Sequence, residues 1–207
     1  MKVLMINGSP RAKGCTFTAL SEIADQLKRE GADSEIVQLG TGPLRDCIAC
    51  HKCDELNNRC IFNDDVVNEI IEKAESADGF VFGTPVYYAH PSGRVLSALD
   101  RIFYAGSSVF AHKPAAAIAS ARRAGTTASF DVMNKYFTIN QMPIVSSTYW
   151  NMVHGNSPEE VRQDLEGLQT MRNIASNMVY LIRCMEAGAE KGINPPKNPK
   201  IFTNFIR

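Results

Sequence analysis

The chain has no excess of charge of either sign, because 22 lysines and arginines balance 22 aspartates and glutamates. Proteins that bind nucleic acid or anionic membranes usually carry a basic patch, so the composition argues against both partners. The sequence also lacks a long apolar run, and only residues 3–6 are apolar between Met1-Lys2 and Asn7-Gly8. We therefore expect no signal peptide or membrane span, a cytoplasmic location, and one compact domain from 207 residues.

Two common nucleotide-binding loops are missing as well. A Walker A loop has four residues between its glycines and then Lys and Ser or Thr, whereas here five residues separate Gly8 from Gly14 and Cys15 comes next. The dinucleotide fingerprint G-x-G-x-x-G is absent because Pro10 stands two positions after Gly8. The pattern argues against a P-loop NTPase and against a dinucleotide loop.

The first apolar segment leads instead into a turn that suits a monophosphate. Residues 7–16 read N-G-S-P-R-A-K-G-C-T and join the strand-like residues 2–6 to a helical pattern. Unpaired N–H groups and the helix dipole favour an anion at a helix N-terminus, where Ser9 and Thr16 add hydroxyls and Arg11 adds a charge. The loop alone also fits an ordinary βα turn, but among nucleotides its length favours the phosphate of FMN.

Apolar strands and amphipathic helices alternate along the chain. A helix is predicted over residues 65–77, and Ser157 and Gly188 are predicted to begin and end a last helix. Strands are predicted at residues 2–6, 34–39, 79–83, 115–120 and 144–148. Since parallel strands need helical crossovers, the pattern predicts a doubly wound parallel α/β sheet with helices on both faces. Ligands bind beyond the carboxyl ends of such strands, where residues 9–16, 84–93 and 120–126 would meet.

The six cysteines are unevenly placed along the chain. In a reducing cytoplasm they favour metal or redox chemistry over disulfides. Four of them fall within fourteen positions with the spacing C-x2-C-x2-C-x6-C, at Cys47, Cys50, Cys53 and Cys60. Ligation of an iron-sulfur cluster, a zinc site and a metal-free loop are all compatible with this spacing. The tight C-x2-C-x2-C run favours a cluster over zinc, whose ligands usually come as two separated pairs.

Two motifs in the right order give a specific resemblance. The loop G-S-P-R-x-x-G-x-T at residues 8–16 and the segment G-T-P-V-Y-Y-x-x-x-S-G-x-x-x-x-x-L-D-R at residues 83–101 resemble the NADPH-dependent FMN reductases. The resemblance covers roughly the first two thirds of the chain. It implies a flavodoxin-like five-stranded parallel sheet in the order 2-1-3-4-5, with FMN as cofactor and NAD(P)H as electron donor.

The resemblance also implies which residues bind the cofactor. The first loop would hold the FMN phosphate, the second segment would lie along the isoalloxazine ring, and Ser120 and Gly125 would line its far side. Arg122 or Arg123 would stabilise the reduced ring or form a solvated pair, and Cys15 stands where relatives often carry Asn. No side chain is implied to be catalytic, because flavin N5 carries the chemistry. The implied cofactor-binding set is Ser9, Arg11, Gly14, Cys15, Thr16, Thr84, Pro85, Val86, Tyr87, Tyr88, Ser120, Arg123 and Gly125.

The cysteine run resembles the compact motif of iron-sulfur flavoproteins, a subgroup of the same family. There one run supplies every ligand of a [4Fe–4S] cluster, which implies Cys47, Cys50, Cys53 and Cys60 as the metal ligands here. The ferredoxin form C-x2-C-x2-C-x3-C-P is not met, because six residues precede Cys60 and Ile61 follows it.

The chain divides by pattern into a domain and a tail. Residues 1–187 are expected to form the FMN-binding domain, with a cysteine-bearing insertion at 40–63. Residues 188–207 are rich in proline and should be extended, although Phe202 and Phe205 favour docking over a free end. The resemblance implies a homodimer or homotetramer, in which the tail or the insertion crosses between subunits.

Three functions compete. The leading one is an FMN-dependent NAD(P)H oxidoreductase that passes electrons to a quinone, a nitro or azo compound or a flavin, with or without a cluster. The second is an iron-sulfur flavoprotein electron carrier between partner proteins, such as a ferredoxin-like protein; carriers are typically strongly acidic, and this chain is neutral. The third is a flavin-free regulatory or zinc-binding module, against which residues 84–93 argue.

Overall fold

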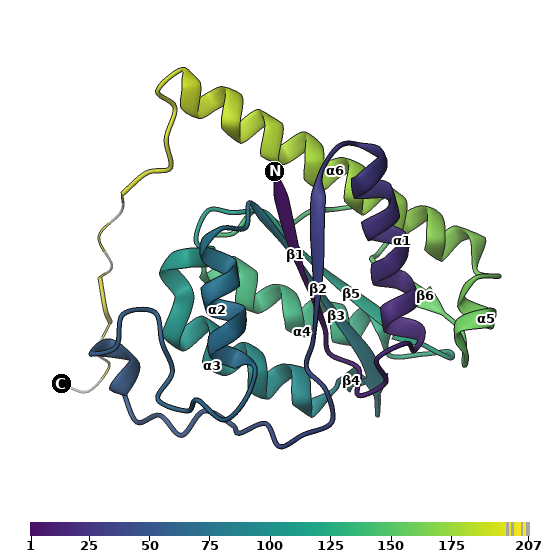
Figure 1. Ribbon diagram of the computed structural model, residues 1–207, viewed down its shortest axis with the longest axis horizontal. Helices are drawn as coiled ribbons and strands as arrows, with labels where there is room; N and C mark the ends of the chain where they lie inside the picture. The colour runs from purple at the N-terminus through teal and green to yellow at the C-terminus, as the bar shows by residue number, and fades with distance from the viewer. Residues whose placement is uncertain (198, 200, 204, 206–207) are drawn as a thin grey trace.

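A parallel sheet forms the centre of the computed structural model, which describes residues 1–197, 199, 201–203 and 205 (Figure 1). In chain order the regular elements are β1 Lys2–Asn7, α1 Cys15–Arg29, β2 Asp33–Gln38, the 3-10 helix η1 Lys52–Asp54, α2 Val67–Glu75, β3 Gly79–Tyr87, β4 His90–Pro91, α3 Gly93–Phe110, β5 Ala115–Ala121, α4 Thr126–Ile139, β6 Met152–His154, α5 Pro158–Val161 and α6 Leu165–Glu190. None of the described helices is both long enough and apolar enough to span a membrane.

The strand order agrees with the prediction. Five parallel strands lie in the order β2-β1-β3-β5-β6, and the short β4 pairs antiparallel with the end of β3. Counting only the parallel strands, this is the predicted order 2-1-3-4-5. Strand β1 pairs on both sides, with Val3 opposite Ser34 of β2 and Gly79 of β3.

Helices cover both faces of the sheet (Figure 1). Leu4 and Ile6 of β1 pack into one apolar cluster with α2, α3 and α4, whereas Val3 and Met5 pack into a second cluster with α1 and α6. This division follows from the alternation of side chains along a strand. Because both faces are buried, the strands read as continuous apolar runs.

The predicted fifth strand was placed too early. Within 144–148 only Ile144 makes a bridge, to Ala115, and the fifth parallel strand is Met152–His154. The Val145 N–H donates to the carbonyl of Ala115, and the chain then leaves the sheet until the carbonyl of Asn151 accepts from the Ala119 N–H. Residues 146–150 therefore form an excursion that the apolar pattern alone does not reveal.

The predicted last helix is two helices. Ser157 caps the four-residue α5, with its Oγ accepting from the Glu160 N–H at 3.3 Å. A second cap interrupts the run, because the Asp164 carboxylate accepts from the Gly167 N–H at 2.9 Å and from the His154 N–H at 2.6 Å. Helix α6 begins after this cap and continues past Gly188 to Glu190.

The tail leaves α6 without entering a further helix or strand among the described residues. Phe202 and Phe205, which the sequence analysis expects to dock, are 86% and 91% exposed on this chain. Burial of these rings within their own subunit is therefore not found. The division into residues 1–187 and 188–207 stays a prediction.

Candidate functional site

The predicted phosphate loop connects the end of β1 to the start of α1. The Ser9 N–H donates to Asn7 Oδ1 at 3.1 Å, and Ser9 Oγ accepts from the Arg11 N–H at 3.1 Å. Helix α1 begins after Gly14, which has no side chain to cap it. The first amide groups of α1 have no carbonyl partner within the helix, so this loop, the cradle, has backbone donors that could hold an anion. Arg11 and Lys13 are exposed beside it.

Close backbone packing shapes this cradle. The Gly8 N–H donates to the Gly83 carbonyl at 2.8 Å, and a Cβ on Gly8 would lie only 2.6 Å from that oxygen. A Cβ on Gly83 would meet Thr16 Cγ2 at 2.8 Å. The Ser92 hydroxyl, which caps α3, donates to the Gly8 carbonyl at 3.3 Å. Two glycines therefore let the loop lie directly on β3, where a side chain would displace it.

The segment predicted as a loop after the third strand is a β-hairpin. Strand β3 continues through Thr84, Pro85 and Val86 to Tyr87, and Tyr87 pairs with His90 of β4. The two turn residues, Tyr88 and Ala89, have φ values of 51° and 57°. Two left-handed residues between antiparallel strands are typical of a type I′ turn, which usually contains Asn or Gly. The sequence does not reveal this hairpin, because Tyr-Ala is not a pair of residues that indicates a turn.

The hairpin presents both tyrosines to solvent at this edge of the sheet. Tyr87 is 49% exposed and Tyr88 is fully exposed. Thr84 is buried below them, where its Oγ1 accepts from the Ser92 N–H at 3.0 Å. The two exposed rings thus give this edge of the sheet an aromatic surface.

The third loop closes the same edge of the sheet. Thr16 Oγ1 and Ser120 Oγ lie 2.7 Å apart and are both buried, so the start of α1 touches the end of β5. Gly125 has φ +92°, and a Cβ there would lie 2.4 Å from Ala89 Cα of the hairpin. Arg122 and Arg123 are exposed on this loop. The structure therefore brings the three predicted FMN-binding segments to one edge, at the carboxyl ends of β1, β3 and β5.

Cys15 adds a neutral group to this edge. Its thiol donates to the Gly155 carbonyl at 3.6 Å, and burial raises the pKa of the thiol. The thiol therefore stays protonated at neutral pH, and it offers no negative charge to oppose a phosphate.

The cysteine segment, residues 40–63, runs along α2 and α3 with η1 as its short helical turn (Figure 1). Cys47, Cys50, Cys53 and Cys60 line one cavity of about 30 Å³ together with Phe62, Arg101 and Tyr104. All four are free thiols, and Cys50 is the exposed one. Burial, reinforced by Asp54, raises the pKa of the Cys53 thiol.

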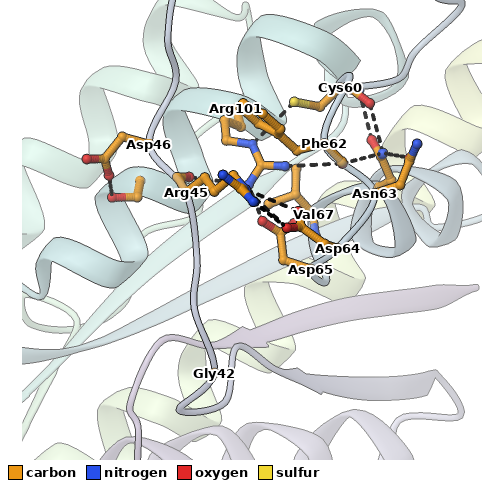
Figure 2. Close-up of polar contacts among 12 residues, drawn as sticks. Gly42, Arg45, Asp46, Cys60, Phe62, Asn63, Asp64, Asp65, Val67 and Arg101 are labelled. Atoms are coloured by element: carbon orange, nitrogen blue, oxygen red, sulfur yellow. Dashed lines mark hydrogen bonds and ion pairs between the residues drawn. The ribbon is translucent and has the colours of Figure 1, made fainter.

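A buried arginine holds this segment to α3 (Figure 2). Arg101 is 1% exposed; it forms an ion pair with Asp65, donates from Nη1 to the Arg45 carbonyl at 3.2 Å and donates from Nε to Cys60 Sγ at 3.3 Å. The guanidinium also lies 5.2 Å from the centre of the Phe62 ring. Arg101 belongs to the L-D-R end of the second motif, but sequence reasoning gave it no role. Its place among the apolar positions of α3 was the available signal.

Asn68 of α2 holds the same segment from the other side. Its Nδ2 donates to the carbonyls of Cys60 and Phe62, both at 2.9 Å, and its Oδ1 accepts from the Cys60 N–H at 2.8 Å. Asn68 is 7% exposed, so these bonds are shielded from water. Asn68 of α2 therefore fixes the backbone of Cys60, whereas Arg101 of α3 contacts its sulfur.

Within the described part of the chain, no three His, Cys, Asp or Glu side chains converge on a position where one metal ion could sit. Four thiolates around zinc must all lie about 2.3 Å from a single centre. In a [4Fe–4S] cluster each thiolate ligates a different iron, which places the four sulfurs farther apart. The four thiols line one cavity, as the ligands of a single metal group must.

Comparison with known proteins agrees with this geometry. A flavodoxin from the domain Archaea superposes with a TM-score of 0.61 at 11% identity, over 88% of this chain and 99% of that one, which shows the flavodoxin-like fold. The family model described as NADPH-dependent FMN reductase matches residues 1–157. The chain therefore belongs to this family of NAD(P)H-dependent flavin oxidoreductases. The family implies FMN and NAD(P)H.

Two relatives show which kinds of protein this chain is similar to in sequence. An iron-sulfur flavoprotein of Methanocaldococcus jannaschii is 29% identical over 197 residues, covering 90% of this chain and 100% of that protein. An NADPH azoreductase of a Bacillus species is 36% identical over 125 residues, covering 58% of this chain and 59% of that protein. The homologues therefore include both iron-sulfur flavoproteins and a reductase named for a small organic substrate.

Proposed function

We propose that this protein passes electrons from NAD(P)H through FMN to a small organic acceptor, such as a quinone, a nitro or azo compound or a flavin. We propose also that Cys47, Cys50, Cys53 and Cys60 hold a [4Fe–4S] cluster on the same chain. The observation that carries the proposal is that four thiols share one cavity on a chain whose three strand-end loops meet elsewhere, at the carboxyl edge of the sheet. The names of the iron-sulfur flavoprotein relatives support the cluster.

The residues of the cradle divide the binding of FMN among them. The amide groups at the start of α1 and the charge of Arg11 would hold the phosphate. The hairpin from Thr84 to Tyr88 would support one side of the ring, and the loop from Ser120 to Gly125 would close the other. Bound FMN would take a hydride from the nicotinamide and release its electrons to the acceptor.

The surroundings of the four thiols suit a negatively charged cluster. No carboxylate lines their cavity, whereas Arg101 does. Arg101 pairs with Asp65 and also donates to Cys60 Sγ, so it would stabilise the thiolate form of that one ligand. The cavity is small, at about 30 Å³, so the segment would rearrange as the metal group is built between the thiols.

A small organic acceptor is favoured over a protein acceptor by two observations. The chain carries no net charge, whereas an electron carrier gains rate from a charged face that steers its partner. The exposed faces of Tyr87 and Tyr88 beside the cradle offer an aromatic surface on which a flat acceptor can stack.

We propose that the chain forms a homodimer or homotetramer. Large apolar side chains remain exposed on this chain, among them Trp150 at 54%, Leu165 at 75% and Tyr180 at 66%. Burial of such residues between copies is the usual basis of a stable assembly. Light scattering coupled to size exclusion tests this, and a monomeric mass at micromolar concentration would contradict it.

Anaerobic turnover tests the acceptor. The FMN-loaded protein is mixed with NADH or NADPH and, in turn, with a quinone, a nitro compound, an azo dye, free FMN and a ferredoxin-like protein. We expect steady-state oxidation of the nicotinamide with at least one small acceptor. Turnover with the ferredoxin-like protein and with none of the small acceptors would establish the electron-carrier function instead.

A further inference from the structure

We propose that Arg101 is a positioning residue for the cysteine segment: its guanidinium fixes the Cys60 sulfur and thereby tunes the reduction potential of the metal group that the four thiols hold. The inference rests on the proposed cluster. Its physical basis is a clasp, seen in Figure 2, in which one buried side chain joins both ends of the segment.

The hydrogen bonds of Arg101 are directed at this segment. Arg101 contacts the Asp65 carboxylate, the Arg45 carbonyl and Cys60 Sγ through Nη1 and Nε. Its Nη2 also donates to the Phe62 carbonyl at 3.4 Å. Burying a guanidinium costs several kcal/mol unless its N–H groups are paired, and an apolar side chain would often fill such a position with no loss of stability. The packing of α3 alone therefore does not account for an arginine here, whereas orientation of the segment does.

The hydrogen bond to the Cys60 sulfur is the contact through which Arg101 would act on the metal group. Arg101 Nε lies 3.3 Å from Cys60 Sγ, and the ion pair with Asp65 fixes the plane of the guanidinium that aims this N–H. Hydrogen bonds to ligand sulfurs raise the potential of an iron-sulfur cluster, because they stabilise the more negative reduced state. Partial burial of Cys60 strengthens this interaction.

Arg45 provides a matched control on the same segment. Its guanidinium lies 5.0 Å from the centre of the same Phe62 ring and pairs with Asp64 at 2.8 Å. Its side chain is 56% exposed and donates to no sulfur among the described residues. Replacing Arg45 with lysine removes its guanidinium from the Phe62 ring, keeps the neighbouring charge and leaves the bond to Cys60 intact.

The test compares Arg101→Lys with Arg45→Lys in the full chain, reconstituted anaerobically with iron and sulfide. Lysine keeps the charge beside Asp65, but a single ammonium cannot reach Asp65, Cys60 and both carbonyls at once. We expect Arg101→Lys to lower the midpoint potential of the cluster and to release iron to a chelator roughly 10-fold to 100-fold faster. Arg45→Lys should match the unmodified protein in both measurements. An unchanged potential in Arg101→Lys would overturn the tuning role, because a purely structural residue would alter only the occupancy.

Hydrogen exchange of the metal-free protein keeps the test independent of cluster loading. Arg101→Lys should accelerate exchange across residues 45–65, whereas Arg45→Lys should leave Cys60 and Phe62 protected. Equal exchange in the two variants would overturn the clasp. If the unmodified protein binds no iron or sulfide, the proposed cluster and the tuning role both fail. The exchange data then still show whether Arg101 holds the cysteine segment in place.

Discussion

At the carboxyl edge of the sheet, the residues assigned to FMN are held by backbone that β1, β3 and β5 position. The cysteine segment, by contrast, contains one three-residue helical turn and depends on side chains of α2 and α3. The first kind of site is built by packing of glycines and short turns, as at Gly8 and Gly125. The second is built by a few buried hydrogen bonds. The two sites should therefore fail separately when single residues are changed.

The largest expected effect is on the cluster. Cys53→Ser should reduce bound iron and sulfide to background, because one of four ligands is lost, and should leave FMN at one per chain. Iron, sulfide and flavin analysis of the anaerobically purified variant provides the measurement. The matched control is Cys184→Ser, which removes an exposed thiol outside the segment and should change neither group. Loss of FMN from Cys53→Ser would show that the two sites are not separable.

At the cradle, a substitution is expected to weaken the binding of FMN. Gly8→Ala forces a Cβ to 2.6 Å from the Gly83 carbonyl, and such overpacking typically costs about 1–3 kcal/mol. We expect a lower thermal midpoint and weak FMN binding, measured by quenching of flavin fluorescence. A Cβ on Gly42, in the cysteine segment, would have no neighbour within 4 Å, so Gly42→Ala should behave as the unmodified protein. Normal FMN affinity in Gly8→Ala would contradict the close-packed loop.

Asn68→Ala tests how the segment is held from α2. It leaves the Cys60 N–H and carbonyl without their partner and removes one of two donors to the Phe62 carbonyl, which we expect to cost about 1–3 kcal/mol in unfolding free energy. Chelator-driven release of iron should be faster, while FMN affinity should not change. Glu72→Ala, an exposed change on the same helix, is the control. Equal iron release by the two variants would argue against a role for Asn68.

Arg11→Ala should affect only flavin affinity. Loss of an exposed charge beside the phosphate should weaken FMN binding about tenfold at low salt, and less at high salt because the charge is screened. Titration of the apoprotein with FMN at two ionic strengths measures this. Lys28→Ala, at the far end of α1, should leave the affinity unaltered. A salt-independent loss would show that Arg11 acts through packing.

The smallest expected effect lies outside both sites. Lys73 and Lys2 donate to Glu35 at the edge strand β2 and hold the pKa of that carboxyl below its usual range. Because the folded-state pKa is the lower one, the pair adds stability above the unfolded pKa of about 4.3 and loses it as pH falls through the folded value. Glu35→Gln should lower stability by no more than about 1 kcal/mol at neutral pH and by progressively less at acidic pH. Urea unfolding of the variant and the unmodified protein at neutral and acidic pH measures this loss of stability. A loss that does not change with pH would contradict the ion pair.

Much of the fold was predictable because the buried parallel strands are continuous apolar runs. Strand order, helices on both faces and the meeting of three loops at one edge follow from that pattern and from the family motifs. The errors lie where polar contacts override the pattern. Asp164 caps a new helix inside an apolar period, and the chain leaves the sheet after Val145. Neither event has a local signal stronger than the pattern around it.

The candidate site was predictable in its cysteines and loops, but not in the side chains that hold them. Arg101 and Asn68 act over sequence separations of 41 and 8 residues, and their partners are mostly backbone atoms. Such contacts leave no spacing rule in a single sequence. A charged residue at a buried helix position is the one clue that sequence reading can use in such a case.

The most direct measurement of the central claim is the absorption spectrum of the anaerobically purified chain, with iron, labile sulfide and FMN counted per chain. We predict flavin bands over a broad sulfide-to-iron absorption, with about four irons and four sulfides for each FMN. Flavin bands with neither iron nor sulfide, even after anaerobic reconstitution, would contradict the claim and leave an FMN reductase whose cysteine segment is purely structural.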